Sequence, residues 1–149
     1  MTCELCDGDG GAVLFRAPRW RVVAVEGAEG RAYPGFCRVI WNAHVREMGD
    51  LPADEQAELM QAVFAVESAL SKALKPVKMN LASLGNLTPH VHWHVVPRLA
   101  GDPAFPKPIW AHVLSRDSPE GAALDTLGHG QPEGMTDWQQ QVRRALEVL

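Results

Sequence analysis

The stretch HVHWHVVPR, residues 90–98, places three of the chain's six histidines at alternate positions. Successive side chains of a β-strand point to opposite faces, so a strand here would present His90, His92 and His94 on one face. The apolar residues between them would then face the core. The sequence therefore predicts a strand with one titratable face and one buried face.

Three imidazoles on one face raise the free-energy cost of protonating them all, and such clusters gather at functional sites. One hypothesis is a metallohydrolase that uses the three histidines as ligands. The nearest carboxylate, Asp102, lies beyond the strand and a turn, which weakens this hypothesis. The other hypothesis is nucleophilic catalysis, in which the central His92 attacks phosphorus and its neighbours balance charge and transfer a proton.

The composition is that of a globular protein, with 149 residues, 46% hydrophobic and 21% charged. A net charge of -4 argues against binding to nucleic-acid polymers, although small nucleotides are not excluded. No apolar run approaches the roughly 20 residues of a membrane span, and no secretory signal is visible. The odd count of three cysteines makes a poor disulfide framework. A cytoplasmic protein without a membrane partner is therefore predicted.

Short β-rich runs separated by turn residues predict strands at residues 12–15, 20–25, 36–41, 78–84 and 90–96. A long helix is indicated by an apolar stripe at helical spacing, formed by Leu59, Val63, Val66, Leu70 and Leu74. Asp50 is expected to cap this helix, with Pro52 in its first turn and its end before Pro76. Thr136 and Gln139 have the spacing of a capping box at the start of a last helix.

These elements predict one α+β domain over residues 1–149, with its core at about 10–99. We expect about five strands in a mainly antiparallel sheet, one long helix, and a C-terminal helix at about 136–148. A crossover around Leu51–Pro76 could instead place one pair of strands in parallel. Residues 100–134 are rich in proline and glycine and are expected to form an irregular extension.

The segment NLASLGNLTPHVHWHVVPR, residues 80–98, resembles the histidine triad (HIT) family. It is most similar to the bacterial branch that resembles diadenosine tetraphosphate hydrolases. The likeness extends more loosely over residues 12–98 and does not cover the tail. The resemblance implies a HIT-like fold, a homodimer, and hydrolysis at a nucleotide α-phosphate through a covalent nucleotidyl-histidine intermediate.

The resemblance also assigns roles to the histidines. His92 matches the family's nucleophile, and His94 matches the histidine on the side of the phosphate and the leaving group. His90 matches the first member of the triad, which supports the site. No cofactor is required for this catalysis. A non-catalytic nucleotide-binding protein and a metallohydrolase remain the alternatives.

Further positions correspond to nucleotide-binding residues of the family. Asn86 corresponds to a residue that faces the phosphate, Asn80 to a polar residue near the pocket, and Glu26 to an acidic residue near the ribose hydroxyls. For Glu26, a solvated turn carboxylate is an equal alternative. Some relatives carry Ser or Thr where this chain has Leu87, with Thr88 next to it, so assistance to the leaving group is expected to differ.

Cys3 and Cys6 have the C-x2-C spacing of half a zinc site, with His44 and His90 as candidates for the remaining ligands. Some bacterial HIT proteins are similar here and hold one structural zinc. We therefore expect a structural zinc that pins the N-terminus to the sheet. The alternative is a pair of ordinary thiols in a frayed terminus.

Overall fold

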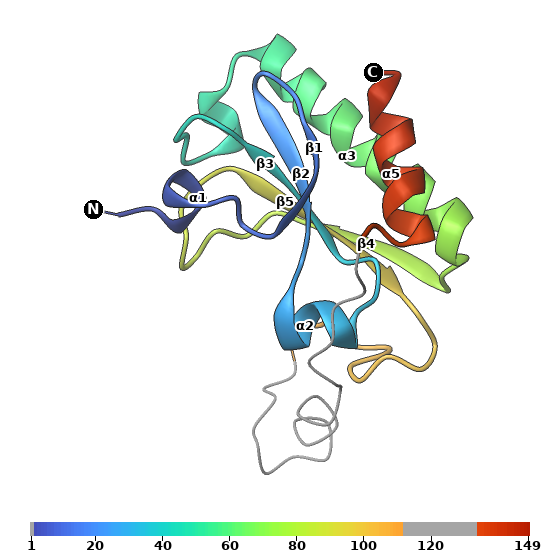
Figure 1. The fold of residues 1–149 in the computed structure, drawn as a ribbon. Coiled ribbons are helices and arrows are strands. Elements are labelled where there is room, and N and C mark those ends of the chain that lie inside the picture. Colours follow the sequence, from blue (N-terminus) through green and yellow to red (C-terminus); the bar gives the residue numbers. More distant parts are fainter. Residues whose placement is uncertain (1, 112–133) are drawn as a thin grey trace.

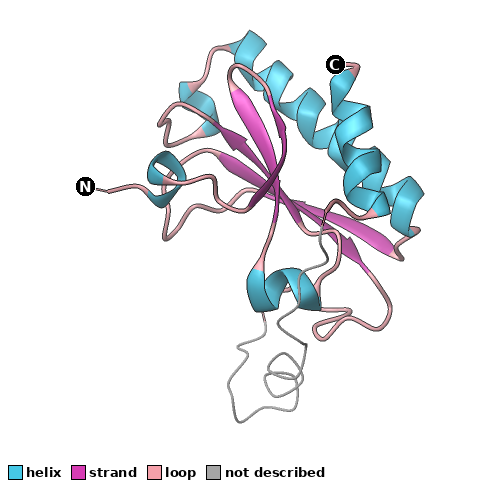
Figure 2. Cartoon of the chain, in the orientation of Figure 1, coloured by secondary structure: helices cyan, strands magenta, loops and turns pink. Residues whose placement is uncertain are grey.

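The computed structural model describes residues 2–111 and 134–149. Its strands are β1 (Ala12–Arg16), β2 (Trp20–Ala24), β3 (Cys37–Trp41), β4 (Lys78–Ala82) and β5 (His92–Arg98). Its helices are α1 (Glu4–Asp7), α2 (Gly27–Ala32), the 3-10 turn η1 (Met48–Asp50), α3 (Ala53–Leu74) and α5 (Asp137–Glu147). Figure 2 shows how these helices flank the strands.

The five strands form one sheet in the order β1-β2-β3-β5-β4, and every neighbouring pair is antiparallel. The chain leaves β3, passes through α3 and returns as β4, and β5 then inserts between the two. The expected crossover is therefore present, but it produces no adjacent parallel pair. The predicted α+β fold with a five-stranded antiparallel sheet is confirmed.

Helices α3 and α5 lie side by side on one face of the sheet (Figure 1). The apolar stripe of α3 faces the strands, and four of its five predicted members are fully buried, namely Leu59, Val63, Val66 and Leu70. Val142 and Leu146 of α5 join the same core. Burial of this stripe is the main stabilising term for the long helix.

On the opposite face of the sheet, two separate apolar clusters of described residues pack against the strands. At one end, Leu5 of α1 packs on Val23 and Ile40. At the other end, a separate apolar cluster joins α2 to β5 and to the loop that follows it, and includes Phe36 and Val96. His92 and His94 project from β5 between these two clusters. Both histidines are buried on this face, at the edge of a cavity between the described elements.

The structure corrects several expected boundaries. The fifth strand begins at His92 and not at His90, so only two of the three histidines belong to it. Asp50 lies in η1, and Pro52 is the residue that precedes α3. The short helices α1 and α2 were not expected, because Gly27 and Gly30 disfavour helix in the sequence.

The C-terminal helix is confirmed at Asp137–Glu147, and the backbone N–H of Thr136 donates to Gln139 Oε1 at 2.9 Å. Residues 99–111 are irregular, as expected, whereas residues 112–133 of the predicted extension lie outside the described residues. In the described part of the chain, no helix is both long enough and apolar enough to cross a membrane.

Candidate functional site

Two buried histidine rings of β5 stand next to each other on the face of the sheet opposite α3 and α5. The centroids of the His92 and His94 rings are 4.9 Å apart, with their planes at 82°. The Nδ1–H of His92 donates to the carbonyl oxygen of His90 at 2.5 Å. This bond assigns the proton to Nδ1, so the Nε2 atom of His92 keeps its lone pair.

Both rings are held in the neutral form. Burial lowers the pKa of His92, and the positive charge of Arg38 lowers it further. Burial also lowers the pKa of His94, to about 3, with smaller contributions from His92 and Arg38. His94 Nδ1 is buried and has no hydrogen-bond partner among the described residues. A neutral imidazole is the form that acts as a nucleophile or a general base.

These rings open into a cavity of about 350 Å³ between α1, β3 and the loop that precedes β5. It is lined by Glu4, Leu5, Arg38, Leu84, Gly85, Asn86, Leu87, Thr88, His92, His94 and Trp110. Its volume lies within the usual range of small-molecule sites, about 300–1,000 Å³. The chain can therefore admit a ligand of mononucleotide size beside His92.

The loop of residues 83–91 forms one wall of the cavity. Gly85 has a φ of +84°, a conformation that side chains rarely adopt, and this turn presents Asn86 to the cavity. The Thr88 hydroxyl donates to the Glu4 carboxylate at 2.7 Å, which ties the loop to α1. Leu87, the residue that departs from the family pattern, is 99% exposed at the tip.

Two predicted nucleotide-binding residues are not among those that line the cavity. Asn80 lies on β4 and accepts a hydrogen bond from Arg98 Nη1 at 3.0 Å. Glu26 is exposed at the N-terminus of α2, just after β2. Asn86 and Thr88, in contrast, do line the cavity. Two of the four predicted nucleotide-binding residues therefore lie at the cavity.

The four predicted metal ligands are brought together on the other side of the same loop. The ligand atoms of Cys3, Cys6, His44 and His90 all lie within 4.8 Å of one another. The Nδ1 atom of His90 is 3.5 Å from both sulfur atoms, and Cys6 Sγ is 3.4 Å from His44 Nδ1. Tetrahedral zinc, with bonds of about 2.3 Å to sulfur and about 2.0 Å to nitrogen, places such atoms about 3.5 Å apart. The cluster is therefore compatible with zinc.

The orientation of His90 supports this assignment. Its Nε2–H donates to the Trp41 carbonyl at 2.6 Å, which directs the Nδ1 lone pair to the thiols. Burial also lowers the pKa of His90, and this favours the neutral form that binds metals. The carbonyl of the same residue holds His92. His90 thus connects the group of possible metal ligands with His92.

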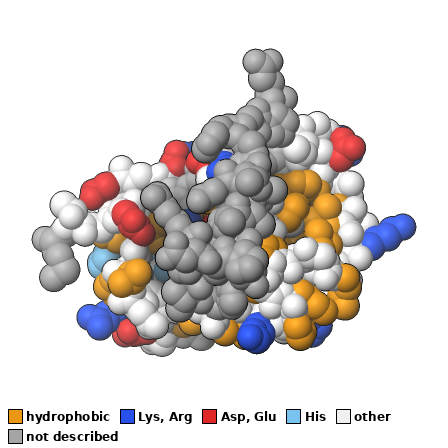
Figure 3. All heavy atoms as spheres, turned by 90° about the horizontal axis from the view of Figure 1, so that it is seen from below, with side chains coloured by type: hydrophobic (Ala, Val, Ile, Leu, Met, Phe, Trp, Pro, Cys, Tyr) orange, Lys and Arg blue, Asp and Glu red, His pale blue; other side chains and the backbone are white. Residues whose placement is uncertain are grey.

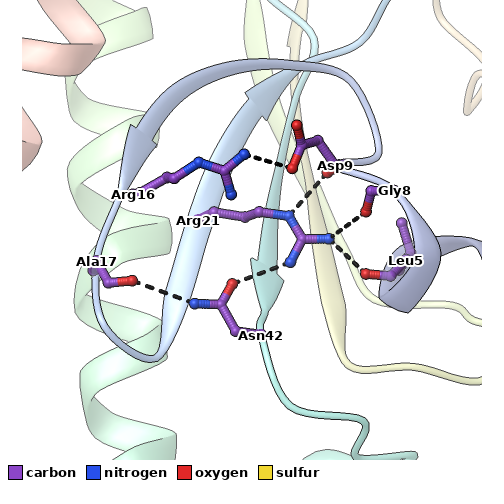
Figure 4. A network of polar contacts seen from close by, with 7 residues as sticks. All are labelled: Leu5, Gly8, Asp9, Arg16, Ala17, Arg21 and Asn42. Carbon is purple, nitrogen blue, oxygen red and sulfur yellow. Dashed lines mark hydrogen bonds and ion pairs between the residues drawn. The ribbon is translucent and has the colours of Figure 1, made fainter.

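Helix α1, which contains Cys6 and directly follows Cys3, is anchored by Arg21 (Figure 4). The guanidinium of Arg21 donates to the carbonyls of Leu5 at 2.7 Å, Gly8 at 3.1 Å and Asp9 at 2.9 Å. It also donates to Asn42 Oδ1 at 3.1 Å. These bonds satisfy backbone oxygens that this four-residue helix cannot satisfy itself.

The geometry does not gather the three histidines around one metal ion. In the part of the chain that the structure describes, the closely spaced group of possible ligands includes His90 but neither His92 nor His94. Asp102, the nearest carboxylate in the sequence, is bound by Arg98 at 2.7 and 2.9 Å. These contacts argue against the metallohydrolase hypothesis.

Sequence reasoning missed several residues that shape the site. Arg38 and Glu4 line the cavity although they lie far from the histidines in the sequence. Trp110 is 42% exposed, and its ring centroid lies 4.6 Å from that of His94. Figure 3 shows histidine and hydrophobic side chains reaching the surface together on one side of its view.

Comparisons with known proteins agree with this geometry. A histidine triad protein from Bradyrhizobium japonicum is 26% identical, with a TM-score of 0.66 over 92% of this chain and 91% of that chain. A histidine triad protein from Marinobacter aquaeolei is 24% identical, with a TM-score of 0.64 over 99% of this chain and 93% of that chain.

A zinc-bound histidine triad family protein from Mycobacterium smegmatis is 21% identical, with a TM-score of 0.57 over 99% of this chain and 95% of that chain. No curated protein matches the chain significantly. The family model described as the HIT domain matches residues 21–101, more than half of the chain. The chain therefore belongs to the histidine triad (HIT) family.

Proposed function

We propose that the protein hydrolyses or transfers nucleotides at the α-phosphate through a covalent nucleotidyl-His92 intermediate. The observation that carries this proposal is the bond from His92 Nδ1–H to the His90 carbonyl. It leaves a neutral imidazole with a free Nε2 lone pair beside a cavity of nucleotide size. Membership of the HIT family supports nucleotide chemistry in general.

The reaction proceeds in two displacements. The Nε2 lone pair of His92 attacks the α-phosphorus and forms a P–N bond, while the bond from phosphorus to the leaving group breaks and the leaving group takes the electron pair. An amine leaving group also takes a proton, which His94 relays from water. Water then attacks the same phosphorus, the P–N bond breaks, and nucleoside monophosphate leaves with His92 restored. Splitting one displacement in two is the purpose of a covalent nucleophile.

His94 is the residue we assign to proton transfer at the leaving group. Its ring lies 4.9 Å from that of His92 and also lines the cavity. Dinucleoside polyphosphates and nucleoside phosphoramidates are the proposed substrates, because both carry an activated bond at the α-phosphorus. Asn86 and Thr88 are proposed to contact the phosphate, and Asn80 and Glu26 remain predictions for the pocket and the ribose.

We assign the Cys3, Cys6, His44 and His90 cluster to a structural zinc that is not consumed in the reaction. When bound, the metal would fix α1 and His90 to each other, and the His90 carbonyl would then hold the His92 ring. Catalysis itself is proposed to need no cofactor. The 3.4–3.5 Å separations between sulfur and nitrogen support the zinc assignment.

A homodimer is also part of the proposal. β4 is an edge strand of the described sheet, and Val77 just before it is exposed. An edge strand offers unpaired backbone groups to a second copy. Light scattering coupled to gel filtration tests this assembly, and a monomeric mass at micromolar concentration would contradict it.

The test of the function is hydrolysis of a dinucleoside tetraphosphate by the wild-type protein and by His92→Ala. We expect the variant to lose activity by at least about 10³-fold, since the nucleophile itself is removed. A strong chelator, added under conditions in which zinc per chain and the circular dichroism spectrum stay unchanged, is expected to leave the rate within twofold. Activity retained in His92→Ala contradicts the mechanism, and activity lost to the chelator favours a metallohydrolase.

A further inference from the structure

The cavity contains one fixed positive charge that the mechanism above does not use. Arg38 lies in the middle of β3, and its Cα pairs across the strands with that of His94. Among the described residues that line the cavity, Arg38 is the only lysine or arginine. Its side chain is partly buried, so its charge is less screened than that of a surface arginine.

The guanidinium of Arg38 is positioned by one hydrogen bond and one loose ion pair among the described residues. Its Nη1 donates to the carbonyl of Gly10 at 3.0 Å, and its Cζ lies 5.9 Å from the centroid of the Phe36 ring. Its Nη2 forms an ion pair with the Glu29 carboxylate at 3.9 Å, a distance too long for a hydrogen bond. A guanidinium has five N–H donors, so several remain for a ligand.

The other buried arginines are used differently. Arg98 makes a bidentate ion pair with Asp102, and Arg21 donates to three backbone carbonyls and to Asn42. Their donors are taken up by the protein. Among the described residues, Arg38 lines the cavity and makes one side-chain hydrogen bond, so that part of the chain leaves it donors for a ligand.

Arg38 is the positive charge that the described lining of the cavity offers to an anionic ligand. Burial keeps the pKa of His94 at about 3, so this ring adds no positive charge at neutral pH. The opposing charges are the Glu4 carboxylate, which lines the cavity and accepts the Thr88 hydroxyl at 2.7 Å, and the Glu29 carboxylate, 3.9 Å from Arg38. Arginine binds phosphate oxygens with charge-assisted hydrogen bonds, which are stronger than neutral ones.

We infer that Arg38 binds an oxygen of the nucleotide's phosphate group and makes the cavity select phosphorylated nucleotides over nucleosides. This inference rests on the proposed function for the identity of the ligand as a nucleotide. It does not depend on the covalent step. Arg38 is thus a specificity-determining residue that the histidine pattern alone does not reveal.

Calorimetric titration with adenosine monophosphate and with adenosine tests the inference on the wild-type protein and on Arg38→Met. We expect Arg38→Met to bind the monophosphate about 10- to 100-fold more weakly and to bind adenosine with unchanged affinity. Arg38→Lys keeps the positive charge but not the paired N–H donors of the guanidinium, so it should lose less affinity for the monophosphate than Arg38→Met does. Arg46→Met is the matched control, since Arg46 is exposed outside the cavity and should leave both affinities unchanged.

Three results would overturn the inference. The first is that Arg38→Met loses affinity equally for adenosine monophosphate and adenosine, and the second is that it loses affinity for neither. The third is that the wild-type protein binds adenosine as tightly as the monophosphate. Failure of the proposed function has a different signature. In that case wild-type protein binds the monophosphate in an Arg38-dependent way but does not turn over a dinucleoside tetraphosphate.

Discussion

Removal of the Arg21 side chain is expected to destabilise the protein and release its N-terminal helix. Arg21 is 5% exposed, and its guanidinium donates to the carbonyls of Leu5, Gly8 and Asp9 and to Asn42. Arg21→Met keeps most of the apolar stem but removes every donor. Leaving buried acceptors without a charged partner costs on the order of 3–5 kcal/mol of unfolding free energy.

Arg16 provides the matched control, because it also binds Asp9 but is exposed. Both side chains of the Arg16–Asp9 pair are more than half exposed, so Arg16→Met should cost less than about 1 kcal/mol. Urea denaturation followed by circular dichroism measures both variants, and zinc per chain is measured on the same samples. Arg21→Met should lose zinc together with stability, since Cys6 lies in α1 and Cys3 directly precedes it. Equal unfolding free energies for the two variants would refute the reasoning.

Two further predictions concern stability. Asp102→Asn leaves Arg98 charged and buried, so urea denaturation should show an unfolding free energy lower by about 3–5 kcal/mol. Glu147→Gln removes an exposed ion pair with Arg143 and should leave the unfolding free energy almost unchanged. The pKa of His94 is about 3 in the folded protein against an ordinary 6.5. The unfolded chain therefore binds the proton first, and stability should rise with pH between these values by up to about 1.4 kcal/mol per pH unit. His94→Asn should flatten that slope, and an unchanged pH profile would contradict the assigned burial.

The fold was largely predictable because its strands and long helix carry strong periodic patterns. The stripe from Leu59 to Leu70 is apolar at helical spacing and is fully buried against the sheet. Helix α1 was not predictable, since four residues have little helical stability of their own. It depends on Arg21, whose contacts join residues 12 to 16 positions away in the sequence.

The candidate site was predictable only where its residues share a sequence motif. His92 and His94 are on one face because β5 is a strand, whereas His90 was misplaced because the strand begins two residues later. The cluster of possible zinc ligands, Cys3, Cys6, His44 and His90, was predicted from the C-x2-C spacing and from the resemblance to the family. Arg38 and Trp110 gave no local signal, because only the folded sheet and the loop after β5 bring them to the histidines.

The central claim is that His92 becomes covalently nucleotidylated during turnover. A dinucleoside tetraphosphate labelled at the α-phosphate is mixed with the protein, quenched within milliseconds in alkaline denaturant, and followed by intact mass and peptide mapping. We predict one nucleotidyl group on the peptide that contains His92, with none in His92→Ala. Turnover without any adduct, or an adduct on another residue, would contradict the account.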